Sequence, residues 1–369
     1  MTGKNQGIIR AAGAMSGTSM DGVDLAVIKT DGVEIAGFGE ARFRPYDGQE
    51  RDILFAAQGC WPKEPGVAAA AALVDRAHLD LAWGIEAEVL GYHGQTLAHA
   101  PRGRGTHQAG DGAVLARGLG LPVVWDFRSA DVRLGGQGAP MACFYHWALA
   151  RHIGARAPIA VLNLGGVGNL TWVDPNASAP DVPGALLAFD TGPANAPMDD
   201  LMRARGLGNY DKGGILARSG RADTRGVAAF LKDEYFTKTP PKSLDRGAFG
   251  SLIKAVAGLD PADAMATLAE CVTGAIVRGM AYVPQPPAEV LVAGGGRRNA
   301  ALMEGLRRDL AVPVRPVEAL GLDGDSLEAQ AFAYLAVRAM RGMTISAPGT
   351  TGVPAPAGGG RISQPGQGS

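Results

Sequence analysis

Short apolar stretches separated by turn residues begin the chain, and they predict β-strands. These stretches cover residues 7–15, 23–29 and 33–43. They follow one another through short connections, which favours an antiparallel meander. The first connection, residues 16–22, is rich in hydroxyl groups and glycine.

A similar order returns in the second half of the chain. Residues 159–164 and 170–173 predict two strands on either side of the glycine turn 165–169, and residues 186–189 predict a third strand. The two halves share the order strand, glycine turn, strand and strand, but little residue identity. We interpret this order as an architectural repeat rather than a sequence repeat.

Helical spacing of apolar residues separates and follows the two meanders. Residues 67–90 show it with a break near Gly84, and residues 299–310 and 327–340 predict two later helices. One further helix has a single apolar face, made of Met265, Leu268, Val272, Ile276 and Met280.

Three more short strands are predicted, each followed by a loop. Residues 89–93 lead into a loop at 91–96, and residues 121–126 are followed by a glycine loop at 134–140. Residues 290–293 lead into three consecutive glycines. The Gly/Pro/Ser-rich end, residues 347–369, predicts a flexible tail that is disordered from about residue 355.

The length of 369 residues exceeds what one hydrophobic core usually holds, so we expect two α/β lobes. The first lobe is predicted to cover residues 1–156, with loops at 16–24, 93–99 and 126–140. The second is predicted to cover residues 157–326. The last helix, 327–343, is expected to return to the first lobe.

Composition narrows the classes of function. With 35 basic and 36 acidic residues the net charge is -1, which argues against a nucleic-acid or anionic membrane partner. The three cysteines are far apart and predict neither disulfides nor a CxxC metal site. No apolar stretch reaches the length of a membrane span, so we expect a cytoplasmic protein.

A carboxylate at the end of a predicted strand is the first candidate for chemistry. Asp190 follows an apolar run and precedes a turn through Gly192 and Pro193. Ligands bind at the edges of α/β sheets where such strands end. The alternative is that Asp190 only caps a helix starting near Asn195, and the local sequence leaves both open.

Three glycine-rich turns at strand ends favour nucleotide binding. They are residues 16–24, 165–169 and 290–296. Backbone N–H groups in such turns can surround a phosphate without a helix, and Asp21 and Asp24 could hold Mg²⁺ through water. An ordinary hairpin turn remains the alternative for residues 16–24. The chain has neither a P-loop nor a GxGxxG motif between strand and helix.

Polar residues after two other strands suit a hydroxyl-rich or carboxylate-bearing small molecule, because arginine can bind a carboxylate through two hydrogen bonds. The set consists of His93, Gln95, Thr96 and His99, with Arg128, Asp131 and Arg133. The histidines lack the partners and spacing of a zinc site. Glu328 is ambiguous, because Asp325 and Glu328 together resemble a capping box, whereas a glutamate at a helix start can also bind sugar hydroxyls.

Eight segments in this order closely resemble the anhydro-N-acetylmuramic acid kinases, from about residue 12 to 343. They are MSGTSMDGVD (15–24), GYHGQTLAH (91–99), DFRSADVRLGGQGAP (126–140), NLGGVGNLTW (163–172), FDTGPANAPMDD (189–200), PPKSLDRGAF (240–249), VAGGGRRNAALM (292–303) and DSLEAQAFAYLA (325–336). The combination is highly specific, whereas no single glycine turn would be.

The resemblance implies the sugar kinase–Hsp70–actin fold, with two ribonuclease-H-like lobes around an ATP cleft. It also implies a reaction in which water opens the 1,6-anhydro ring of 1,6-anhydro-N-acetylmuramic acid at C1. O6 then takes the γ-phosphate of ATP, and the product is the N-acetylmuramic acid 6-phosphate of cell-wall recycling. ATP and Mg²⁺ are the implied cofactors, and a homodimer is left open.

By resemblance, Asp190 is the catalytic base, the loop 16–24 lines the phosphates of ATP, and the loops 93–99 and 126–140 line the sugar pocket. Asp21 is the candidate metal ligand through water. The implied nucleotide residues are Gly17, Thr18, Ser19, Met20, Asp21, Gly22, Val23, Asp24, Gly165, Gly166, Asn195, Gly294, Gly295 and Asn299. The candidates for the sugar pocket are Gln95, Thr96, Arg128, Asp131 and Glu328. Of these, Arg128 is the better partner for the lactyl carboxylate.

Two positions depart from the family pattern. Ala194 stands where the family commonly has glycine, and Arg133 stands where a small residue is usual. Ala194 is expected to restrict the loop beside Asp190. A kinase acting on another sugar or small alcohol, and a nucleotide-gated binding protein, are the alternative functions. ATP turnover that responds to the anhydro sugar would distinguish the anhydro-sugar kinase from a nucleotide-gated binding protein.

Overall fold

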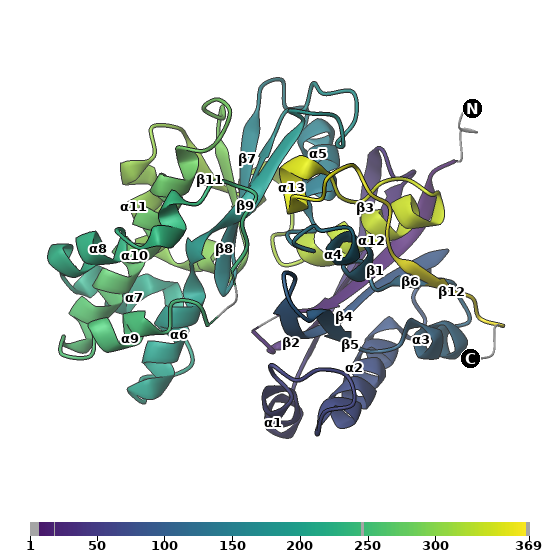
Figure 1. The fold of residues 1–369 in the computed structure, drawn as a ribbon, viewed down its shortest axis with the longest axis horizontal. Coiled ribbons are helices and arrows are strands. Elements are labelled where there is room, and N and C mark those ends of the chain that lie inside the picture. Colours follow the sequence, from purple (N-terminus) through teal and green to yellow (C-terminus); the bar gives the residue numbers. More distant parts are fainter. Residues whose placement is uncertain (1–6, 18, 245–246, 367–369) are drawn as a thin grey trace. The chain divides into compact units, whose positions relative to one another are not determined.

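The computed structural model describes residues 7–17, 19–244 and 247–366. The chain forms two compact units (Figure 1). Unit 1 takes the described residues up to Ala155, the short segment Ser178–Pro183 and the chain from Ser326 onward. Unit 2 takes Arg156–Ala177 and Gly184–Asp325. The first boundary lies one residue from the predicted one, and the last long helix belongs to unit 1.

Unit 1 is built on a mixed sheet in the order β12-β6-β4-β1-β2-β3, with β5 paired to β4. Its strands are β1 (Ile9–Ser16), β2 (Gly22–Thr30), β3 (Ile35–Pro45), β4 (Val89–Ala100), β5 (Gly105–Ala109), β6 (Val123–Trp125) and β12 (Arg361–Ser363). Its helices are α1 (Gly48–Ala56), α2 (Val67–Ala82), α3 (Gly112–Leu119), α4 (Ser129–Arg133), α5 (Cys143–His152), α12 (Leu327–Met340) and α13 (Pro348–Thr351). The predicted meander is β1, β2 and β3, in antiparallel pairs.

Unit 2 is built on a sheet in the order β11-β10-β7-β8-β9. Its strands are β7 (Ile159–Leu164), β8 (Val167–Val173), β9 (Leu186–Pro193), β10 (Val290–Ala293) and β11 (Val314–Pro316). Its α-helices are α6 (Asn195–Ala204), α7 (Ile215–Ser219), α8 (Thr224–Phe230), α9 (Ser251–Ala255), α10 (Pro261–Met280) and α11 (Ala300–Asp309). Short 3₁₀ helices are η1 (Lys212–Gly214), η2 (Glu234–Thr237), η3 (Gly295–Arg298) and η4 (Val317–Leu320).

The two sheets repeat one topology. In unit 1, β1 pairs antiparallel with β2 and parallel with β4, and β4 pairs parallel with β6. In unit 2, β7 pairs antiparallel with β8 and parallel with β10, and β10 pairs parallel with β11. The predicted repeat and α/β fold class are therefore confirmed by strand order as well as by the order of elements along the chain.

Helix α12 covers one face of the unit 1 sheet, where it packs against β1, β2 and β4. Its bounds match the prediction for residues 327–340. Gly13 of β1 and Gly91 of β4 lie directly under it, and a Cβ atom at either position would overlap the backbone carbonyl of Ala329 or Phe332. Because glycine has no side chain, the backbone of α12 can pack directly against the backbone of the sheet at these two positions.

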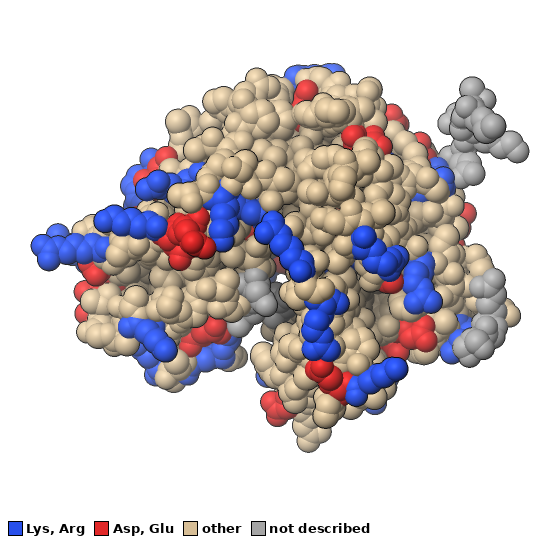
Figure 2. Space-filling view, viewed as in Figure 1, with Lys and Arg blue, Asp and Glu red and all other residues tan. Residues whose placement is uncertain are grey.

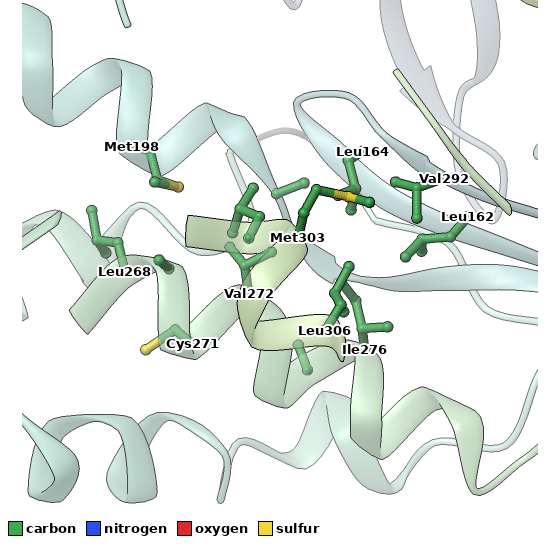
Figure 3. Close-up of a cluster of buried hydrophobic side chains, with 14 of the residues drawn as sticks. Leu162, Leu164, Met198, Leu268, Cys271, Val272, Ile276, Val292, Met303 and Leu306 are labelled. Atoms are coloured by element: carbon green, nitrogen blue, oxygen red, sulfur yellow. The ribbon is translucent and has the colours of Figure 1, made fainter. Parts of the chain in front are cut away.

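The core of unit 2 forms between its sheet and helices α10 and α11 (Figure 3). Leu268, Val272 and Ile276 of the predicted apolar face are fully buried there. They meet strand residues such as Leu162, and Leu306 of α11. Burial of one such side chain typically contributes about 1.5–3 kcal/mol, so this face holds α10 against the sheet.

Several predictions about local structure are wrong. The predicted loop 126–140 contains helix α4, and the predicted glycine turn 165–169 ends at Gly166, because β8 begins at Val167. The predicted loop 91–96, and with it the sugar-pocket loop 93–99, is part of strand β4, because β5 supplies a second pairing partner. The predicted flexible tail contains α13 and β12, which adds to the edge of the sheet through antiparallel pairing with β6. The Trp125 indole N–H donates to the Ser363 hydroxyl at 3.1 Å, which anchors this segment.

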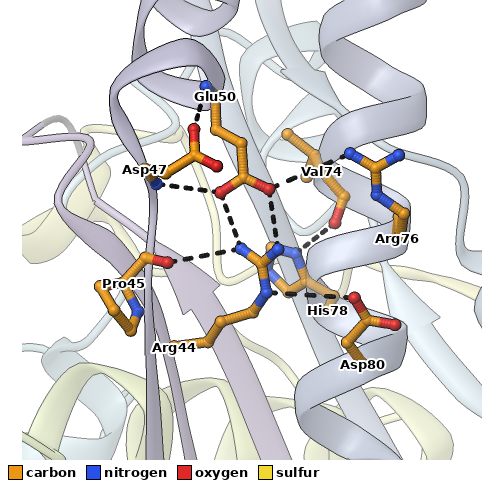
Figure 4. A network of polar contacts seen from close by, with 8 residues as sticks. All are labelled: Arg44, Pro45, Asp47, Glu50, Val74, Arg76, His78 and Asp80. Carbon is orange, nitrogen blue, oxygen red and sulfur yellow. Dashed lines mark hydrogen bonds and ion pairs between the residues drawn. The ribbon is translucent and has the colours of Figure 1, made fainter.

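A polar network joins β3, α1 and α2 in unit 1 (Figure 4). The Arg44 guanidinium donates two hydrogen bonds to the Glu50 carboxylate, at 3.0 and 2.7 Å. Asp47 and Glu50 form a capping box at the start of α1. The hydrogen bond from Arg44 lowers the pKa of Glu50, so this network favours the ionised carboxylate.

Acidic and basic side chains are interspersed over both units on the face shown in Figure 2, in keeping with the balanced net charge. Among the described residues, no helix is long and apolar enough to cross a membrane. Cys60, Cys143 and Cys271, which all lie in the described part of the chain, form no disulfide.

Candidate functional site

Asp190 lies within β9, not after it as predicted, and its residue is only 8% exposed. It sits opposite Asn169 of β8 at a β-bulge, because Gly168 pairs with Gly192 and Thr191 is the extra residue. The Thr191 hydroxyl donates to the Gly168 carbonyl at 3.0 Å. Bulges redirect side chains at the rims of sheets, so this one sets the direction of the Asp190 carboxylate.

The Asp190 carboxylate is held by a segment distant in sequence. The Leu244 N–H donates to Asp190 Oδ2 at 2.7 Å, and the Asp190 N–H donates to the Lys242 carbonyl at 2.9 Å. The Tyr235 hydroxyl donates to the Asp190 carbonyl at 2.5 Å. Helix α6 takes Ala194 as its N-cap, without a side-chain hydrogen bond. The capping interpretation of Asp190 is therefore wrong.

Ala194 has φ of -130°, which lies outside the left-handed region that favours glycine. Its side chain is fully buried in the core of unit 2. The Ala194 N–H donates to the Gly166 carbonyl at 3.1 Å. The departure from the family pattern is therefore accommodated with its backbone N–H satisfied.

The glycine turn after β7 supports the start of α6. The carbonyls of Gly165 and Gly166 accept hydrogen bonds from the N–H groups of Asn195 and Ala196, at 2.9 and 3.2 Å. The Asn195 amide donates to the Leu164 carbonyl at 2.9 Å. These bonds fix Asn195 at the start of α6, where the positive end of the helix dipole favours an anion, although the N–H groups of Ala194, Asn195 and Ala196 already donate to backbone carbonyls.

The glycines after β10 lie beside the same residues. Gly294 has φ of +73°, a left-handed conformation that favours glycine. A Cβ atom at Gly295 would lie 3.6 Å from the Asn195 amide nitrogen. Asn299 is the N-cap of α11, and its side chain accepts from the Leu302 N–H at 3.3 Å. Within unit 2, the structure thus brings Asn195 together with Gly295, whereas Gly294 lies against Leu164 and Asn299 has a capping role.

Arg297, which sequence reasoning did not single out, ties this glycine segment to the end of unit 2. Its side chain is 3% exposed and bonds to Glu318 at 2.6 Å and Asp325 at 2.9 Å. It also donates to the Gly294 carbonyl at 2.9 Å. Because Asp325 pairs with arginine and Ser326 is the N-cap of α12, the capping box with Glu328 is wrong.

Gln95 of β4 supports the turn between β1 and β2 through two hydrogen bonds. The Ser16 hydroxyl donates to Gln95 Oε1 at 2.5 Å, and Gln95 Nε2 donates to the Gly17 carbonyl at 3.2 Å. Gln95 is fully buried and supports this turn, and its place in the sugar pocket stays a prediction. Met20 has φ of +52°, an uncommon conformation for a non-glycine residue that often marks a functional site.

The rest of this turn presents polar groups to solvent. The Ser19 hydroxyl donates to Asp21 Oδ1 at 2.7 Å, and both residues are exposed. Gly22 and Val23 begin β2, and Asp24 is half-buried within it. Thr18 lies outside the described residues. An exposed carboxylate beside a glycine turn is compatible with Mg²⁺ held mostly by water and phosphate oxygens.

Arg128 and His93 form a fixed pair. Arg128 Nε and Nη2 lie 3.1 and 3.0 Å from His93 Nε2, and Nη1 donates to the Gly138 carbonyl at 2.7 Å. His93 Nδ1 lies 2.9 Å from the Gly94 carbonyl. Burial, and then the positive charge of Arg128, hold the pKa of His93 well below its ordinary value. The neutral imidazole therefore accepts from the guanidinium and orients it.

Glu328 is exposed at the start of α12, near Arg128 and Asp21. Surrounding protein raises the pKa of its carboxyl by desolvation, Arg128 opposes this shift and Asp21 adds to it. Unit 1 thus brings Glu328 and Arg128 together although 200 residues separate them in sequence.

Three other residues singled out in the sequence, Asp131, Thr96 and Arg133, are not part of the pair formed by Arg128 and His93. Asp131 is 1% exposed, and its two oxygens accept from the Gly138 N–H at 2.6 Å and the Thr351 hydroxyl at 2.5 Å. It therefore holds the glycine loop against α13, and its contact with the sugar stays a prediction. Thr96 is half-buried and accepts from Gln108 at 3.2 Å. Arg133 is exposed at the end of α4.

Comparison with known proteins gives one consistent result. The family model for anhydro-N-acetylmuramic acid kinase matches residues 9–364. The chain is 58% identical to anhydro-N-acetylmuramic acid kinase 1 of Jannaschia sp., over 99% of both chains. It is 59% identical to the anhydro-N-acetylmuramic acid kinase of Cereibacter sphaeroides, over 97% of both chains. The corresponding protein of Ruegeria sp. is 55% identical, over 97% of this chain and 96% of its own.

Proposed function

The chain belongs to the anhydro-N-acetylmuramic acid kinase family, and from this premise we propose that Asp190 is the general base of its reaction. The protein is an ATP-dependent kinase that opens the 1,6-anhydro ring of its sugar and phosphorylates O6. The observation that carries the assignment is the match over nearly the whole chain. The buried, bulge-directed carboxylate of Asp190 supports the assignment of the base.

Bond changes in the reaction balance without a separate acid. Water attacks C1 of the anhydro sugar, and a base takes one of its protons. The C1–O6 bond breaks, and its electron pair stays on O6. O6 then forms a bond to the γ-phosphorus of ATP, and ADP leaves. Charge that develops on O6 passes to the phosphoryl group, so the main demand is to position water, sugar and phosphate.

Asp190 is suited to the role of the base. The Leu244 N–H at 2.7 Å fixes one carboxylate oxygen, and the backbone contacts of Asp190 fix the position of its Cα. A general base must lie within hydrogen-bond reach of the water from which it takes the proton. A carboxylate held from both its backbone and its side chain can keep such a geometry.

Each unit offers groups that suit ATP. In unit 2, the start of α6 and Gly295 lie together at Asn195, and the positive end of the helix dipole there favours phosphate. In unit 1, the turn between β1 and β2 would supply backbone N–H groups. Asp21 would hold Mg²⁺ through water, and the ion would neutralise charge on the phosphates when bound.

Arg128 and Glu328 are our candidates for sugar contacts. His93 and the Gly138 carbonyl hold the Arg128 guanidinium in place, and a fixed guanidinium suits the lactyl carboxylate. Glu328 has no capping duty at α12, so its carboxyl is available for sugar hydroxyls.

The function is tested by following ADP release and sugar phosphate together. We expect ATP turnover to depend on the 1,6-anhydro sugar and to yield one 6-phosphate sugar for each ADP. N-Acetylmuramic acid itself, in which the ring is already open, is the matched control. Equal ADP release with and without the anhydro sugar would overturn the assignment.

Glu328→Gln is expected to raise the Michaelis constant for the sugar about tenfold or more, since hydrogen bonds to a charged group are typically worth about 1.5–3 kcal/mol. The melting temperature should not fall, because the carboxyl caps nothing and its pKa is raised by desolvation. Steady-state kinetics and thermal unfolding of the same preparation check both expectations.

The matched control for Glu328→Gln is Glu304→Gln, which removes an exposed carboxylate paired with Arg218 at 3.1 Å in unit 2. That variant should keep the Michaelis constant of the wild type. If Glu328→Gln lost thermal stability but kept its sugar Michaelis constant, Glu328 would have only a structural role.

A further inference from the structure

Lys242 is a buried cation close to Asp190. Its residue is 8% exposed, and Nζ donates to the Tyr235 carbonyl at 3.1 Å. Nζ also lies 4.5 Å from the centre of the Tyr235 ring and 4.7 Å from that of Tyr282. The Phe189 ring is 5.9 Å away. Three aromatic faces partly replace the water that the ammonium loses on burial.

The contacts of Lys242 close a ring around Asp190. The ammonium binds the Tyr235 carbonyl, and the Tyr235 hydroxyl binds the Asp190 carbonyl at 2.5 Å. The Asp190 N–H returns to the Lys242 carbonyl at 2.9 Å. Two residues further on, the Leu244 N–H binds the Asp190 carboxylate at 2.7 Å. The segment that orients the carboxylate is thus fastened by the lysine side chain.

We propose that Lys242 is a positioning residue, whose ammonium group holds the Lys242–Leu244 segment against Asp190 and thereby aims the carboxylate. This proposal rests on the proposed function, because it assigns Asp190 as the base. Lys242 acts through Tyr235 and Leu244, and none of its described contacts requires it to touch a substrate.

The positive charge of Lys242 strengthens both its hydrogen bond to the Tyr235 carbonyl and its cation–π contacts. A neutral amine loses the cation–π attraction and leaves a weaker hydrogen bond to the carbonyl. Burial, and then the nearby Lys238 ammonium, lower the pKa of Lys242 to about 8. The groups around it are the rings of Phe189, Tyr235 and Tyr282 and the ammonium of Lys238, and the Asp190 N–H donates to the Lys242 carbonyl. The lysine therefore changes charge in a range of pH that kinetics can reach.

Loss of the Lys242 charge is expected to change stability and activity in opposite directions. The folded pKa lies below the unfolded pKa, so between about pH 8 and about 10.5 the unfolded chain binds more protons. The free energy of unfolding contributed by this group therefore rises with pH through that window. A neutral replacement should be at least as stable as the wild type at pH 7, yet less active.

Lys242→Met keeps the length of the side chain and removes its charge, and it is the decisive variant. We expect kcat for sugar-dependent phosphorylation to fall about tenfold at pH 7, because misplacement of a reacting group by about 1 Å costs up to about 10²-fold. The Michaelis constant for ATP and the melting temperature should not worsen. Above pH 8 the ratio of wild-type to variant kcat should shrink, as the wild-type lysine loses its proton.

The matched control is Lys238→Met. Lys238 is exposed and pairs with Glu234 at 3.2 Å. Its removal should leave kcat at pH 7 unchanged and should move the alkaline decline to slightly higher pH, since one repelling charge near Lys242 is gone. Lys242→Arg should restore part of the lost kcat, because it retains a cation.

Other outcomes separate this proposal from the proposed function. If the wild type lacks sugar-dependent turnover, the function is wrong. If the wild type is active and Lys242→Met keeps kcat within twofold from pH 6 to 9, the positioning role is wrong. A Lys242→Met protein that merely unfolds at lower temperature, with a kcat ratio independent of pH, would also overturn it.

Discussion

Asp190→Asn is expected to lose about 10²–10⁴-fold of sugar-dependent phosphorylation, the usual cost of removing a general base. The substitution keeps the size of the side chain and an oxygen that can still accept from the Leu244 N–H. The backbone contacts to Lys242 and Tyr235 remain. The amide cannot take a proton from the attacking water, so the chemical step fails while the fold persists.

Binding of ATP should survive in Asp190→Asn, because the glycine turn at Gly165 and Gly166 and the start of α6 do not depend on the carboxylate. Calorimetric titration with ATP and the rate of product formation separate the two effects. Asp52→Asn, which changes an exposed carboxylate in α1, is the control and should behave as the wild type. Retention of activity within about tenfold would remove Asp190 from the role of base.

Gly13→Ala is expected to destabilise unit 1 severely. The added methyl group would overlap the Ala329 carbonyl oxygen and the Ala333 nitrogen of α12. These are backbone atoms, so no rotamer change relieves the clash, and the helix must move off the sheet. Overpacking of a core typically costs about 1–3 kcal/mol and occasionally more, and a clash with backbone belongs at or above the top of that range.

Urea unfolding followed by tryptophan fluorescence measures this loss. Gly37→Ala is the matched control, because Gly37 also lies in a strand of unit 1 but a Cβ atom there has no neighbour within 4 Å. If both variants unfolded at the same urea concentration, the close approach of α12 to β1 would not limit the stability of unit 1.

Local patterns predicted most of the elements, because each depends on neighbours in sequence. The strand at 159–164, the strand at 290–293 and the helix at 327–340 have the bounds that were expected. The sequence predicts too short a strand at β4, because Gly91 and Gly94 are typical of loops. The structure requires these glycines for another reason, since a Cβ atom would meet α12 at Gly91 and β5 at Gly94.

The end of the chain shows the same limit. Glycine and proline content predicted a flexible tail, but residues 361–363 pair with β6. A short strand of this kind is stabilised by the sheet edge that it meets and not by its own composition. Nothing local in the sequence reveals that such an edge is available.

The candidate site divides in the same way. Motifs identified Asp190, the glycine turns, Arg128 and Glu328, because these residues lie in segments of strong family resemblance. The same motifs also included Gln95 and Asp131, whose side chains are buried and serve neighbouring loops. A polar residue in a motif can bind a ligand or shape the loop that binds it, and only burial and hydrogen-bond partners separate the two.

The sequence by itself determined the class of fold, the repeated order of strands and the family, since these follow from periodicity and from segments read one at a time. Only the tertiary structure decided what each polar side chain does. Asp190 is aimed by a bulge and by Leu244, and Lys242 reaches it through Tyr235 across more than 40 residues of chain. The physical reason is that burial and hydrogen-bond geometry depend on residues brought together from distant parts of the chain.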